Sequence, residues 1–248
     1  MPHPALQHQD HRPWPLPERS WVLTMQWTDL AFLHWPVATS ALQRLLPAGV
    51  EVETYDGSAW LGIVPFCMRR TRIRGLPPLP TAHEFPELNV RTYVRCAGKS
   101  GVWFFSLDAA SRLAVEGARA TFSLPYFRAE MAIEQRGQLV SYTSKRIDPR
   151  GPSAHFAAGY CPGGNSRPAA PGSLEHFLVE RYCLFAPARG GGVRCGEIAH
   201  AKWQLQPASV QLGVCDMTRL LGISLPDVAP FALCAEPVEV AAWAPVRC

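Results

Sequence analysis

The stretch Glu87-Leu88-Asn89-Val90-Arg91-Thr92-Tyr93-Val94 alternates strictly between two kinds of side chain. Side chains of a β-strand project to opposite faces with a period of two, so this stretch predicts a strand with two different faces. One face carries aliphatic and β-branched residues, which are Leu88, Val90, Thr92 and Val94. The other carries a carboxylate, an amide, a guanidinium and a phenol, on Glu87, Asn89, Arg91 and Tyr93.

Two interpretations of the polar face compete. In the first it meets water, as one side of an ordinary antiparallel sheet does. In the second it lines the inside of a small barrel or cone, where the four polar groups converge on a cavity that holds a small polar ligand. Such a cavity also shifts the pKa of a carboxylate. Spacing alone favours the first interpretation, because this alternation is common in antiparallel sheets.

The neighbouring sequence predicts further hairpins. Turn signals join three pairs of β-rich runs, which are Val50–Tyr55 with Ala59–Met68, Leu88–Arg95 with Gly101–Leu107, and Tyr126–Gln135 with Gln138–Ile147. Other strands are expected at 21–35, 194–210 and 238–243. Sequential hairpins with few helices predict an α+β fold, mainly antiparallel β.

Three helices are expected between these strands. A short helix follows a cap at Thr39 or Ser40, a second runs over 109–121 with Asp108 as its N-cap, and a third runs over 174–185 after Ser173. Residues 148–172, rich in proline and glycine, predict a long loop. Residues 1–19, rich in proline, histidine and glutamine, predict a disordered tail before a single domain over 20–248.

Composition limits the chemistry. Apolar residues make up 48% of the chain and charged residues 18%, with a net charge of +4, as in a packed globular domain. Arginine dominates the cations, so any amine chemistry depends on Lys99, Lys145 or Lys202. The arginine run over 69–74 favours a solvated strand edge, and no nucleic-acid partner is expected because such binding needs a wider basic surface with aromatic platforms.

The eight cysteines form no CxxC pair and no zinc-like spacing with histidine, so no metal site is expected. The chain shows no secretory signal and no apolar run long enough to span a membrane, which predicts reduced thiols and a cytoplasmic location without a membrane partner. Standard phosphate-loop, dinucleotide, hydrolase and zincin motifs are absent, and no cofactor is predicted.

Other candidate residues lie outside the central strand. Glu130 and Lys145 each occupy a polar face of a predicted strand, and a curled sheet would bring them toward Glu87 and Arg91. His200, close to Trp203, is typical of a structural histidine but is also the best acid–base candidate if the protein is an enzyme. His176 and Glu180 have metal-ligand spacing, although ion pairs on the helix surface explain them better.

Several motifs carry a family resemblance. They are HWPV at 34–37, DGSAWLGIVPF at 56–66, FPELNVRTYV at 85–94, GVWFFSLDA at 101–109, LPYFRAEM at 124–131 and LEHFLVERY at 174–182. In order and spacing they resemble the YqjF family, also described as DUF2071, over about Trp27 to Trp243. The resemblance implies an acetoacetate decarboxylase-like β cone or barrel with two or three packed helices and a mostly apolar cavity. It therefore implies that the polar face of 87–94 points inward.

The resemblance also implies a departure from the decarboxylases. Those enzymes use a buried lysine as a Schiff-base nucleophile, with a glutamate on a cavity strand, and Glu87 falls where that glutamate is expected. The lysine is expected near Leu124–Phe127, which here reads Leu-Pro-Tyr-Phe. Without an amine at that point the decarboxylase mechanism has no electron sink, unless Lys145 serves from a neighbouring strand.

Three functional hypotheses follow. The first is a protein that binds a small polar or oxo-acid-like molecule in a cavity lined by Glu87, Asn89, Arg91, Tyr93 and Glu130. In this hypothesis Arg91 pairs with the ligand, or with Glu87 when the cavity is empty. The second is an enzyme on a carbonyl or enol substrate, with Glu87 as general base and Lys145 or His200 as an auxiliary group. The third is a structural or interaction protein, whose cavity is filled by side chains. The sequence predicts neither the ligand nor the oligomeric state.

Overall fold

The computed structural model describes residues 3–188 and 190–248. Over these residues most of the chain is strand, in one mixed sheet. The strands are β1 (Leu23–Thr28), β2 (Leu30–Val37), β3 (Glu51–Val52), β4 (Ala59–Ile73), β5 (Phe85–Cys96), β6 (Lys99–Ala109), β7 (Tyr126–Arg136), β8 (Leu139–Arg146), β9 (His155–Pro162), β10 (Cys183–Pro187), β11 (Val193–His200), β12 (Leu205–Cys215), β13 (Phe231–Ala235), β14 (Val238–Ala242) and β15 (Val246–Arg247). The helices within the described ranges are η1 (Pro4–Leu6), α1 (Thr39–Gln43), α2 (Arg112–Phe122), α3 (Leu174–Val179) and η2 (Arg219–Leu221).

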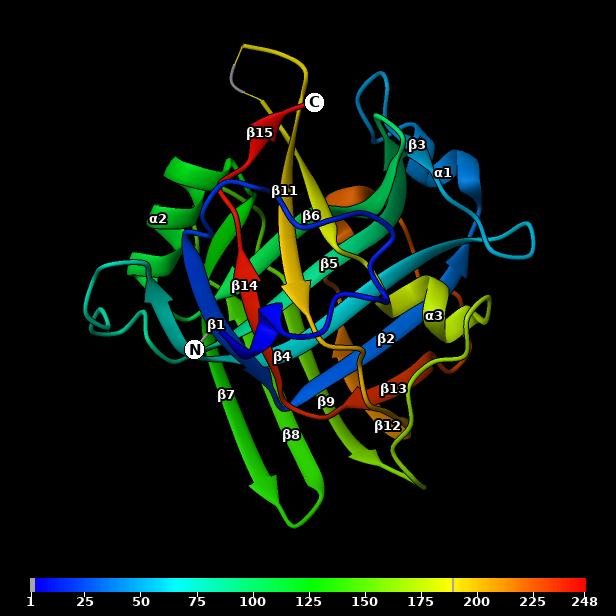
Figure 1. Cartoon of the computed structure of the whole chain (residues 1–248). Helices are drawn as coiled ribbons and strands as arrows, with labels where there is room; N and C mark the ends of the chain where they lie inside the picture. Colours follow the sequence, from blue (N-terminus) through cyan, green and yellow to red (C-terminus); the bar gives the residue numbers. More distant parts are fainter. Residues whose placement is uncertain (1–2, 189) are drawn as a thin grey trace.

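The sheet closes on itself twice, around three shared central strands (Figure 1). β4, β5 and β6 pair antiparallel, side by side. The first ring continues from β6 through β10, β11, β14 and β1 back to β4. The second ring continues from β6 through β7, β8, β9, β12, β13 and β2 back to β4. The predicted fold class, mainly antiparallel β with a few helices, is confirmed, and the closed rings are not a regular barrel.

Two strands make this double closure possible because each divides one edge between two partners. The first half of β4 pairs with β2 at 59–63, and its second half pairs with β1 at 67–73. Likewise β6 pairs with β10 at 102–103 and with β7 at 107–109. Both of these β6 pairings are parallel, so the sheet is mixed.

Strand β5 is consequently covered on both faces. Leu88 and Val90 pack into the apolar core of the second ring, together with Tyr142 and Phe156. The polar face turns into the first ring, where Glu87 is 2% exposed and Asn89 4% exposed. The polar face of this strand therefore does not meet water. Glu87 and Asn89, residue types that are usually found at a surface, lie in the interior.

The hairpin predictions have mixed outcomes. β5 with β6 and β7 with β8 form the hairpins expected from the sequence. At Asp56-Gly57 the chain does turn, with reciprocal backbone hydrogen bonds between Tyr55 and Ser58. The hairpin predicted there is wrong, however, because β3 pairs with β5 through Glu51 and Arg95 rather than with β4.

The helix and loop predictions need three corrections. α2 begins at Arg112, and its N-cap is Ser111, whose Oγ accepts a hydrogen bond from Ala114 N at 3.1 Å. Asp108, the predicted cap, belongs to β6 instead. α3 ends at Val179, because the chain beyond it pairs as β10 with both β11 and β6. The predicted loop over 148–172 contains β9, which fills a position between β8 and β12.

Residues 3–19 are not a disordered tail, because buried side chains anchor them. Trp14 Nε1 donates to Glu197 Oε2 at 2.8 Å, and Arg12 pairs with the same carboxylate oxygen at 3.3 Å. Lys99 donates to the other oxygen of Glu197 at 2.8 Å. Ala5 is buried beside Trp243 in a small apolar cluster. The composition of this segment suggested disorder, but a few anchoring contacts to β11 hold it.

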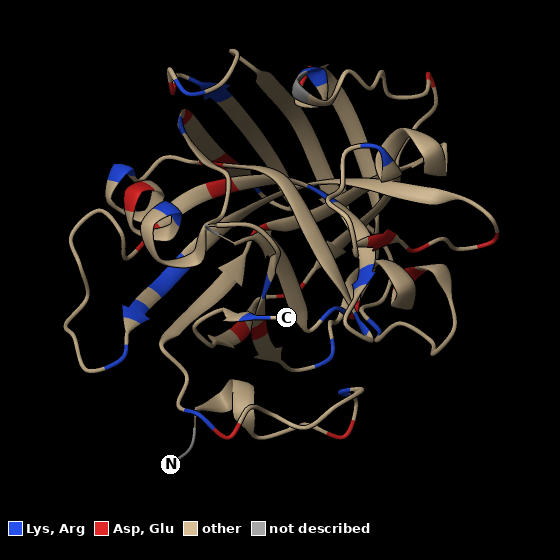
Figure 2. Ribbon diagram, turned by 90° about the horizontal axis from the view of Figure 1, so that it is seen from above, with Lys and Arg blue, Asp and Glu red and all other residues tan. Residues whose placement is uncertain are grey.

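Charged residues are interspersed over the strands and loops rather than gathered on one face (Figure 2). No helix among the described residues is long and apolar enough to cross a membrane. Within the same residues, no group of three or more His, Cys, Asp and Glu side chains is arranged to hold a metal ion.

Candidate functional site

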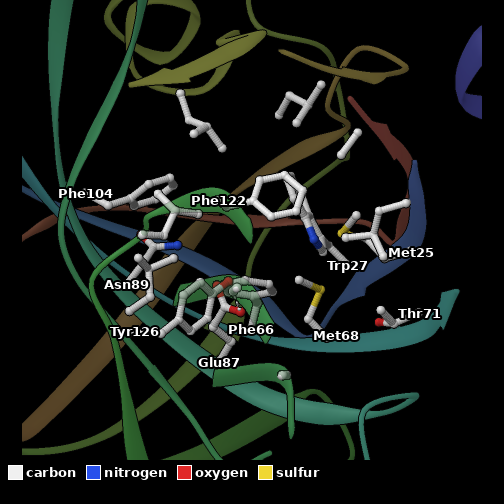
Figure 3. Close-up of a pocket in the computed structure, with 18 of the residues that line it drawn as sticks. Met25, Trp27, Phe66, Met68, Thr71, Glu87, Asn89, Phe104, Phe122 and Tyr126 are labelled. Carbon is white, nitrogen blue, oxygen red and sulfur yellow. Dashed lines mark hydrogen bonds between the residues drawn. The ribbon is translucent and has the colours of Figure 1, made fainter. Parts of the chain in front are cut away.

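A cavity of about 340 Å³ lies inside the first ring and extends to α2 (Figure 3). Its wall is mostly apolar, with side chains that include Met25, Phe32, Val64, Phe66, Leu107 and Phe122. Toward the surface, Ile73 and Leu113 line it and are 42% and 48% exposed. The cavity is therefore apolar both in its interior and at its rim. A few polar groups in the wall are what would fix the orientation of a bound molecule.

Glu87 is the buried carboxyl group of this wall. The period of two along β5 turns it into the cavity, and Tyr126, at the start of β7, donates its hydroxyl to Glu87 Oε2 at 2.9 Å. Burial raises the pKa of Glu87 to about 8, against the opposing hydrogen bond from Tyr126, and the Asp108 charge adds a smaller increase. At neutral pH the group is therefore mostly a carboxylic acid. Tyr126 occupies Oε2, and among the described residues no side chain donates to Oε1.

Asn89, two residues along the same face, adds an amide to the wall. It is 4% exposed, and its Oδ1 is buried without a partner among the described residues. Figure 3 shows the Asn89 amide on the same side of the cavity as Glu87 and Tyr126. A buried polar atom without a partner costs free energy, and a ligand that pairs with it recovers that cost. The carboxyl of Glu87 and the amide of Asn89 thus make one polar end in a chamber whose wall is mostly apolar.

Arg91 lies further along this face and also lines the cavity. Its Nη2 donates to the carbonyl oxygen of Leu178 at 3.3 Å, and its guanidinium lies 5.2 Å from the ring centroid of Phe32. Within the described chain its Nε is buried without a partner. The sequence predicted that Arg91 pairs with Glu87 when the cavity is empty. The structure gives it backbone and aromatic partners instead, which leaves the Nε donor without a partner among the described residues.

Tyr93 shares the face but not the cavity wall. Its hydroxyl lies 2.5 Å from His34 Nε2, and its ring packs against Phe177. The pKa of His34 is lowered by burial and by the nearby Arg91 charge, so the imidazole is neutral. Tyr93 therefore has a structural role on β5, through its contacts with His34 and Phe177, and it does not line the cavity. The sequence analysis had placed it among the ligand-binding residues.

His200 does reach the cavity wall, from the end of β11. Its Nδ1 lies 2.8 Å from the carbonyl oxygen of Ala201, and its ring is stacked on Tyr182 with centroids 4.8 Å apart. Burial lowers its pKa, so it is uncharged at neutral pH. The stacked, hydrogen-bonded ring fits the structural role that the sequence favoured, although the residue also lines the cavity.

Glu130 and Lys145 lie outside the cavity. They are directly opposite each other on β7 and β8 and are exposed on the outer surface of the second ring. The inner face of these strands carries Met131 and Tyr142 instead, which pack in the core of that ring. Alternation identified the two faces of these strands correctly but not which one faces inward. Neither residue is a candidate for the cavity.

The other lysines are engaged or exposed as well. Lys99 pairs with Glu197 at 2.8 Å, and Lys202 is exposed beside Trp203. Tyr126, which the sequence reasoning missed, occupies the segment where the resemblance places a lysine, and its hydroxyl contacts Glu87. The signal was present, since a tyrosine follows Leu124-Pro125 at that point. Its contact depends on the parallel pairing of β6 with β7, which sequence did not predict.

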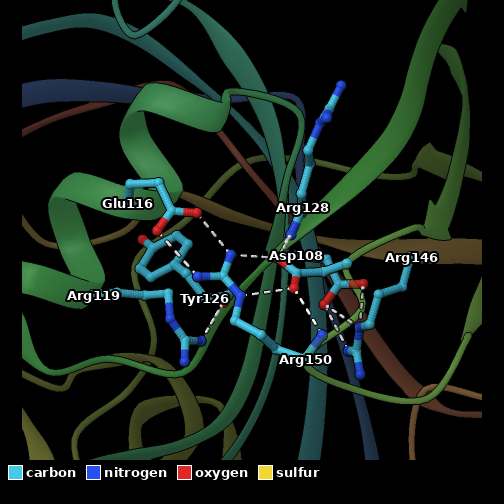
Figure 4. Close-up of polar contacts among 8 residues, drawn as sticks. Asp108, Glu116, Arg119, Tyr126, Arg128, Arg146 and Arg150 are labelled. Carbon is cyan, nitrogen blue, oxygen red and sulfur yellow. Dashed lines mark hydrogen bonds and ion pairs between the residues drawn. The ribbon is translucent and has the colours of Figure 1, made fainter.

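A polar network behind the cavity fixes Tyr126 and α2 (Figure 4). Arg119 of α2 donates to the backbone oxygen of Tyr126 at 2.7 Å. Arg150 joins Glu116 of α2 at 2.8 Å to Asp148 in the loop after β8. Because both contacts hold α2 against the strands, the helix that closes one side of the cavity is anchored rather than free.

Solved structures define the class of this fold. An acetoacetate decarboxylase-like enzyme from Sphingomonas wittichii RW1 superposes with a TM-score of 0.64 at 14% identity, covering 93% of this chain and 94% of that one. The enduracididine biosynthesis enzyme MppR complexed with pyruvate superposes with a TM-score of 0.61 at 11% identity, covering 95% and 93%. The chain therefore has an acetoacetate decarboxylase-like fold.

Sequence comparison then gives the family. The family model DUF2071, described as an uncharacterized conserved protein, matches residues 24–239. The protein YqjF of Bacillus subtilis (strain 168) is 42% identical over 232 residues, which is 94% of each chain. This chain belongs to the DUF2071 family, as the sequence motifs suggested.

Proposed function

We propose that the cavity binds a small molecule with an apolar body and a carbonyl group, with oxo acids as the first class to test. The observation that carries the proposal is the neutral Glu87 carboxyl, held by Tyr126 next to the Asn89 amide, whose Oδ1 has no partner among the described residues, in a chamber whose wall is mostly apolar. A protonated carboxyl donates a hydrogen bond to a carbonyl oxygen, and the dry surroundings strengthen that bond.

A further polar group of the cavity wall suits an oxo acid. Arg91 lines the same cavity, and its Nε has no partner among the described residues, so it supplies a cation for a ligand carboxylate while Glu87 takes the carbonyl oxygen. Pyruvate, the molecule bound to MppR, is a compound of this kind, although that likeness extends only to the fold. The apolar wall would accommodate a longer or bulkier carbon chain than that of pyruvate.

Thermal melting against a panel of oxo acids, ketones and matched hydrocarbons tests the proposal. We expect stabilisation by at least one oxo acid and none by the hydrocarbon of equal size. Glu87→Leu abolishes the shift, Glu87→Gln retains much of it because an amide still donates, and Glu130→Leu on the outer surface leaves it unchanged. The absence of a shift with every carbonyl compound, in a folded sample, would refute the proposal.

The pKa of Glu87 also favours a second candidate, an enzyme acting on a carbonyl or enol substrate. A group with a pKa of about 8 transfers protons efficiently near neutral pH. Because it is mostly protonated there, Glu87 would act first as a general acid toward the carbonyl oxygen, rather than as the general base that the sequence suggested. His200, elsewhere in the cavity wall, is a group that can accept a proton.

Exchange of ligand α-protons with deuterated water, followed by NMR, separates this enzyme from a simple binding protein. An enzyme accelerates the exchange, and both Glu87→Leu and Glu87→Gln remove the acceleration, because an amide cannot transfer the proton. Binding without exchange supports the first candidate. A purely structural role, the third hypothesis, predicts a cavity filled by side chains, whereas about 340 Å³ is open here.

A further inference from the structure

A second set of polar atoms belongs to the cavity wall, away from Asn89. Trp27 Nε1 and Thr71 Oγ1 are buried without a hydrogen-bond partner among the described residues, and both residues line the cavity. Figure 3 shows Trp27 and Thr71 on the side of the cavity opposite Asn89. Of the nine buried side-chain atoms without a partner in the described chain, four belong to residues of this wall. Unsatisfied polar groups are thus concentrated at the cavity.

A β-bulge in β4 brings Thr71 into the wall. Before the bulge, the even-numbered residues over 64–68 line the cavity, so a period of two would bring Arg70 in next. Instead the register shifts, and Arg70 and Thr71 both lie opposite the single residue Met25 of β1. Arg70 has a positive φ of 51° and is exposed, whereas Thr71 lines the cavity. The extra residue therefore exchanges a guanidinium for a hydroxyl-bearing side chain in the wall, as bulges next to functional sites do.

The loop after β4 holds the bulged segment. Thr71 N donates to the carbonyl oxygen of His83 at 3.0 Å, and His83 Nδ1 lies 3.3 Å from the carbonyl oxygen of Thr71. Leu79 and Ala82 of the same loop line the cavity. The backbone of Thr71 is therefore anchored on a segment that itself belongs to the wall.

Strand register gives the order of the polar groups along the cavity. Glu87 of β5 lies opposite residue 66 of β4, and Trp27 of β1 lies opposite residue 68. Thr71 lies opposite the position of β1 that is two residues before Trp27. At about 3.3 Å per residue, the indole-bearing position is about 7 Å beyond that of Glu87 along the strands, and the hydroxyl-bearing position about 13 Å beyond it.

The two atoms select what can lie beside them. The indole N–H of Trp27 is a donor only, whereas the hydroxyl of Thr71 both donates and accepts. A ligand hydroxyl pairs with either of them, whereas a methyl group leaves both unpaired, and a buried unpaired group costs free energy. Between Glu87 and this pair, Phe66 and Met68 line the cavity and suit a stretch of hydrocarbon.

We propose that the ligand is an oxo acid whose carbon chain carries a hydroxyl group at its far end, bound by Trp27 and Thr71. The inference rests on the proposed binding of the oxo-acid group by Glu87 and Arg91. It adds a second polar contact, separated from the first by hydrocarbon. The cavity then distinguishes this compound from the same chain ending in a methyl group, because only the hydroxyl satisfies the two buried atoms.

Isothermal titration calorimetry of the whole protein with α-oxooctanoate and with ω-hydroxy-α-oxooctanoate tests the inference. We expect the hydroxylated acid to bind the wild type at least about fivefold more tightly, which corresponds to about one neutral hydrogen bond. Trp27→Phe removes the N–H and Thr71→Val removes the hydroxyl, and each reduces this preference to less than about twofold. Thr71→Ser keeps a hydroxyl and retains the preference.

Two matched variants outside the cavity wall are controls. Trp60→Phe removes an indole N–H that is also buried without a partner in the described chain, but that does not line the cavity. Thr143→Val removes an exposed hydroxyl of β8. Both controls should show the wild-type preference. Equal binding of the two acids by the wild type, or a preference retained in Trp27→Phe or Thr71→Val, would overturn this inference and leave the oxo-acid proposal standing. A wild type that binds neither acid would overturn both.

Discussion

Two carboxyl groups are buried on neighbouring strands, but they differ in their charge at neutral pH. Glu87 on β5 and Asp108 on β6 are one register position apart, since Leu88 pairs with Asp108. Glu87 points into the cavity of the first ring and accepts a hydrogen bond from the hydroxyl of Tyr126, and its pKa is raised to about 8. Asp108 is fully buried, and Arg146 Nη2 donates to its Oδ1 at 2.6 Å.

The two groups differ because Asp108 is paired with a cation, Arg146, and Glu87 is not. Burial raises the pKa of Asp108 to about 6, but its hydrogen bonds with Arg146 oppose the rise and keep the carboxylate ionised at neutral pH. Glu87 has no such cation and keeps its proton. A buried charge is tolerated when it is paired and hydrogen-bonded. The Asp108–Arg146 pair therefore has a structural role, whereas Glu87, a neutral acid in the cavity wall, is the group that we propose for ligand binding.

The largest expected effect comes from breaking the Asp108–Arg146 pair. Arg146→Met leaves the Asp108 charge buried without its partner, and we expect a loss of about 3–5 kcal/mol in the free energy of unfolding. Urea unfolding at neutral pH measures it. Arg128→Met, at an exposed arginine of β7, should change stability by less than about 0.5 kcal/mol.

The double variant Asp108→Leu with Arg146→Met sharpens this test. Replacing both charges by apolar groups should recover most of the lost stability, because no unpaired charge remains. A loss below about 1 kcal/mol for Arg146→Met alone would contradict the structural role of the pair.

The sequence predicted most of what depends on local pattern. The alternation in β5 identified its polar face, and turn residues located the β5–β6 and β7–β8 hairpins. It did not predict the two parallel pairings of β6 or the divided edge of β4, because these contacts join distant segments. The cap assigned to Asp108 failed for the same reason, since its partner Arg146 lies on β8.

The candidate site follows the same rule. Glu87, Asn89 and Arg91 were predicted together because they share one strand and one face. Tyr126 was missed, since its contact with Glu87 requires β7 to lie beside β6. Glu130 was included wrongly in the cavity, and Lys145, considered as an auxiliary group, lies opposite it on the outer surface, because alternation gives two faces without saying which one a closed ring turns inward.

The next largest effect concerns Glu87 and pH. Above its ordinary pKa of 4.5 the carboxyl ionises in the unfolded chain, but the folded protein keeps the proton up to about pH 8. The folded state then binds more protons, so stability falls as pH rises across this window. Glu87→Gln removes this contribution, and the fall from pH 5 to pH 8 should shrink by about 3 kcal/mol.

Urea unfolding of both proteins at several pH values measures the difference. Glu130→Gln, an exposed glutamate of β7, serves as the control and should follow the wild type. Parallel pH profiles for Glu87→Gln and the wild type would mean that Glu87 is ionised in the folded protein. The neutral hydrogen-bond donor in the proposed site would then be lost.

The smallest effect separates binding from stability within one strand. Asn89→Leu removes a buried amide oxygen that has no partner among the described residues, so it should raise the free energy of unfolding by about 1 kcal/mol while it weakens ligands that offer this oxygen an O–H or N–H donor. Thr92→Val, on the opposite face, removes a hydroxyl that donates to Trp60 O at 2.9 Å and should lower stability by about 1 kcal/mol without affecting the ligand. If the unpaired amide is kept for a ligand at the expense of stability, the two variants change the free energy of unfolding in opposite directions, and only Asn89→Leu loses binding. If Asn89→Leu is instead destabilising and binds as well as the wild type, the amide has a partner in the folded protein, and the polar end of the cavity is reduced to Glu87 and Arg91.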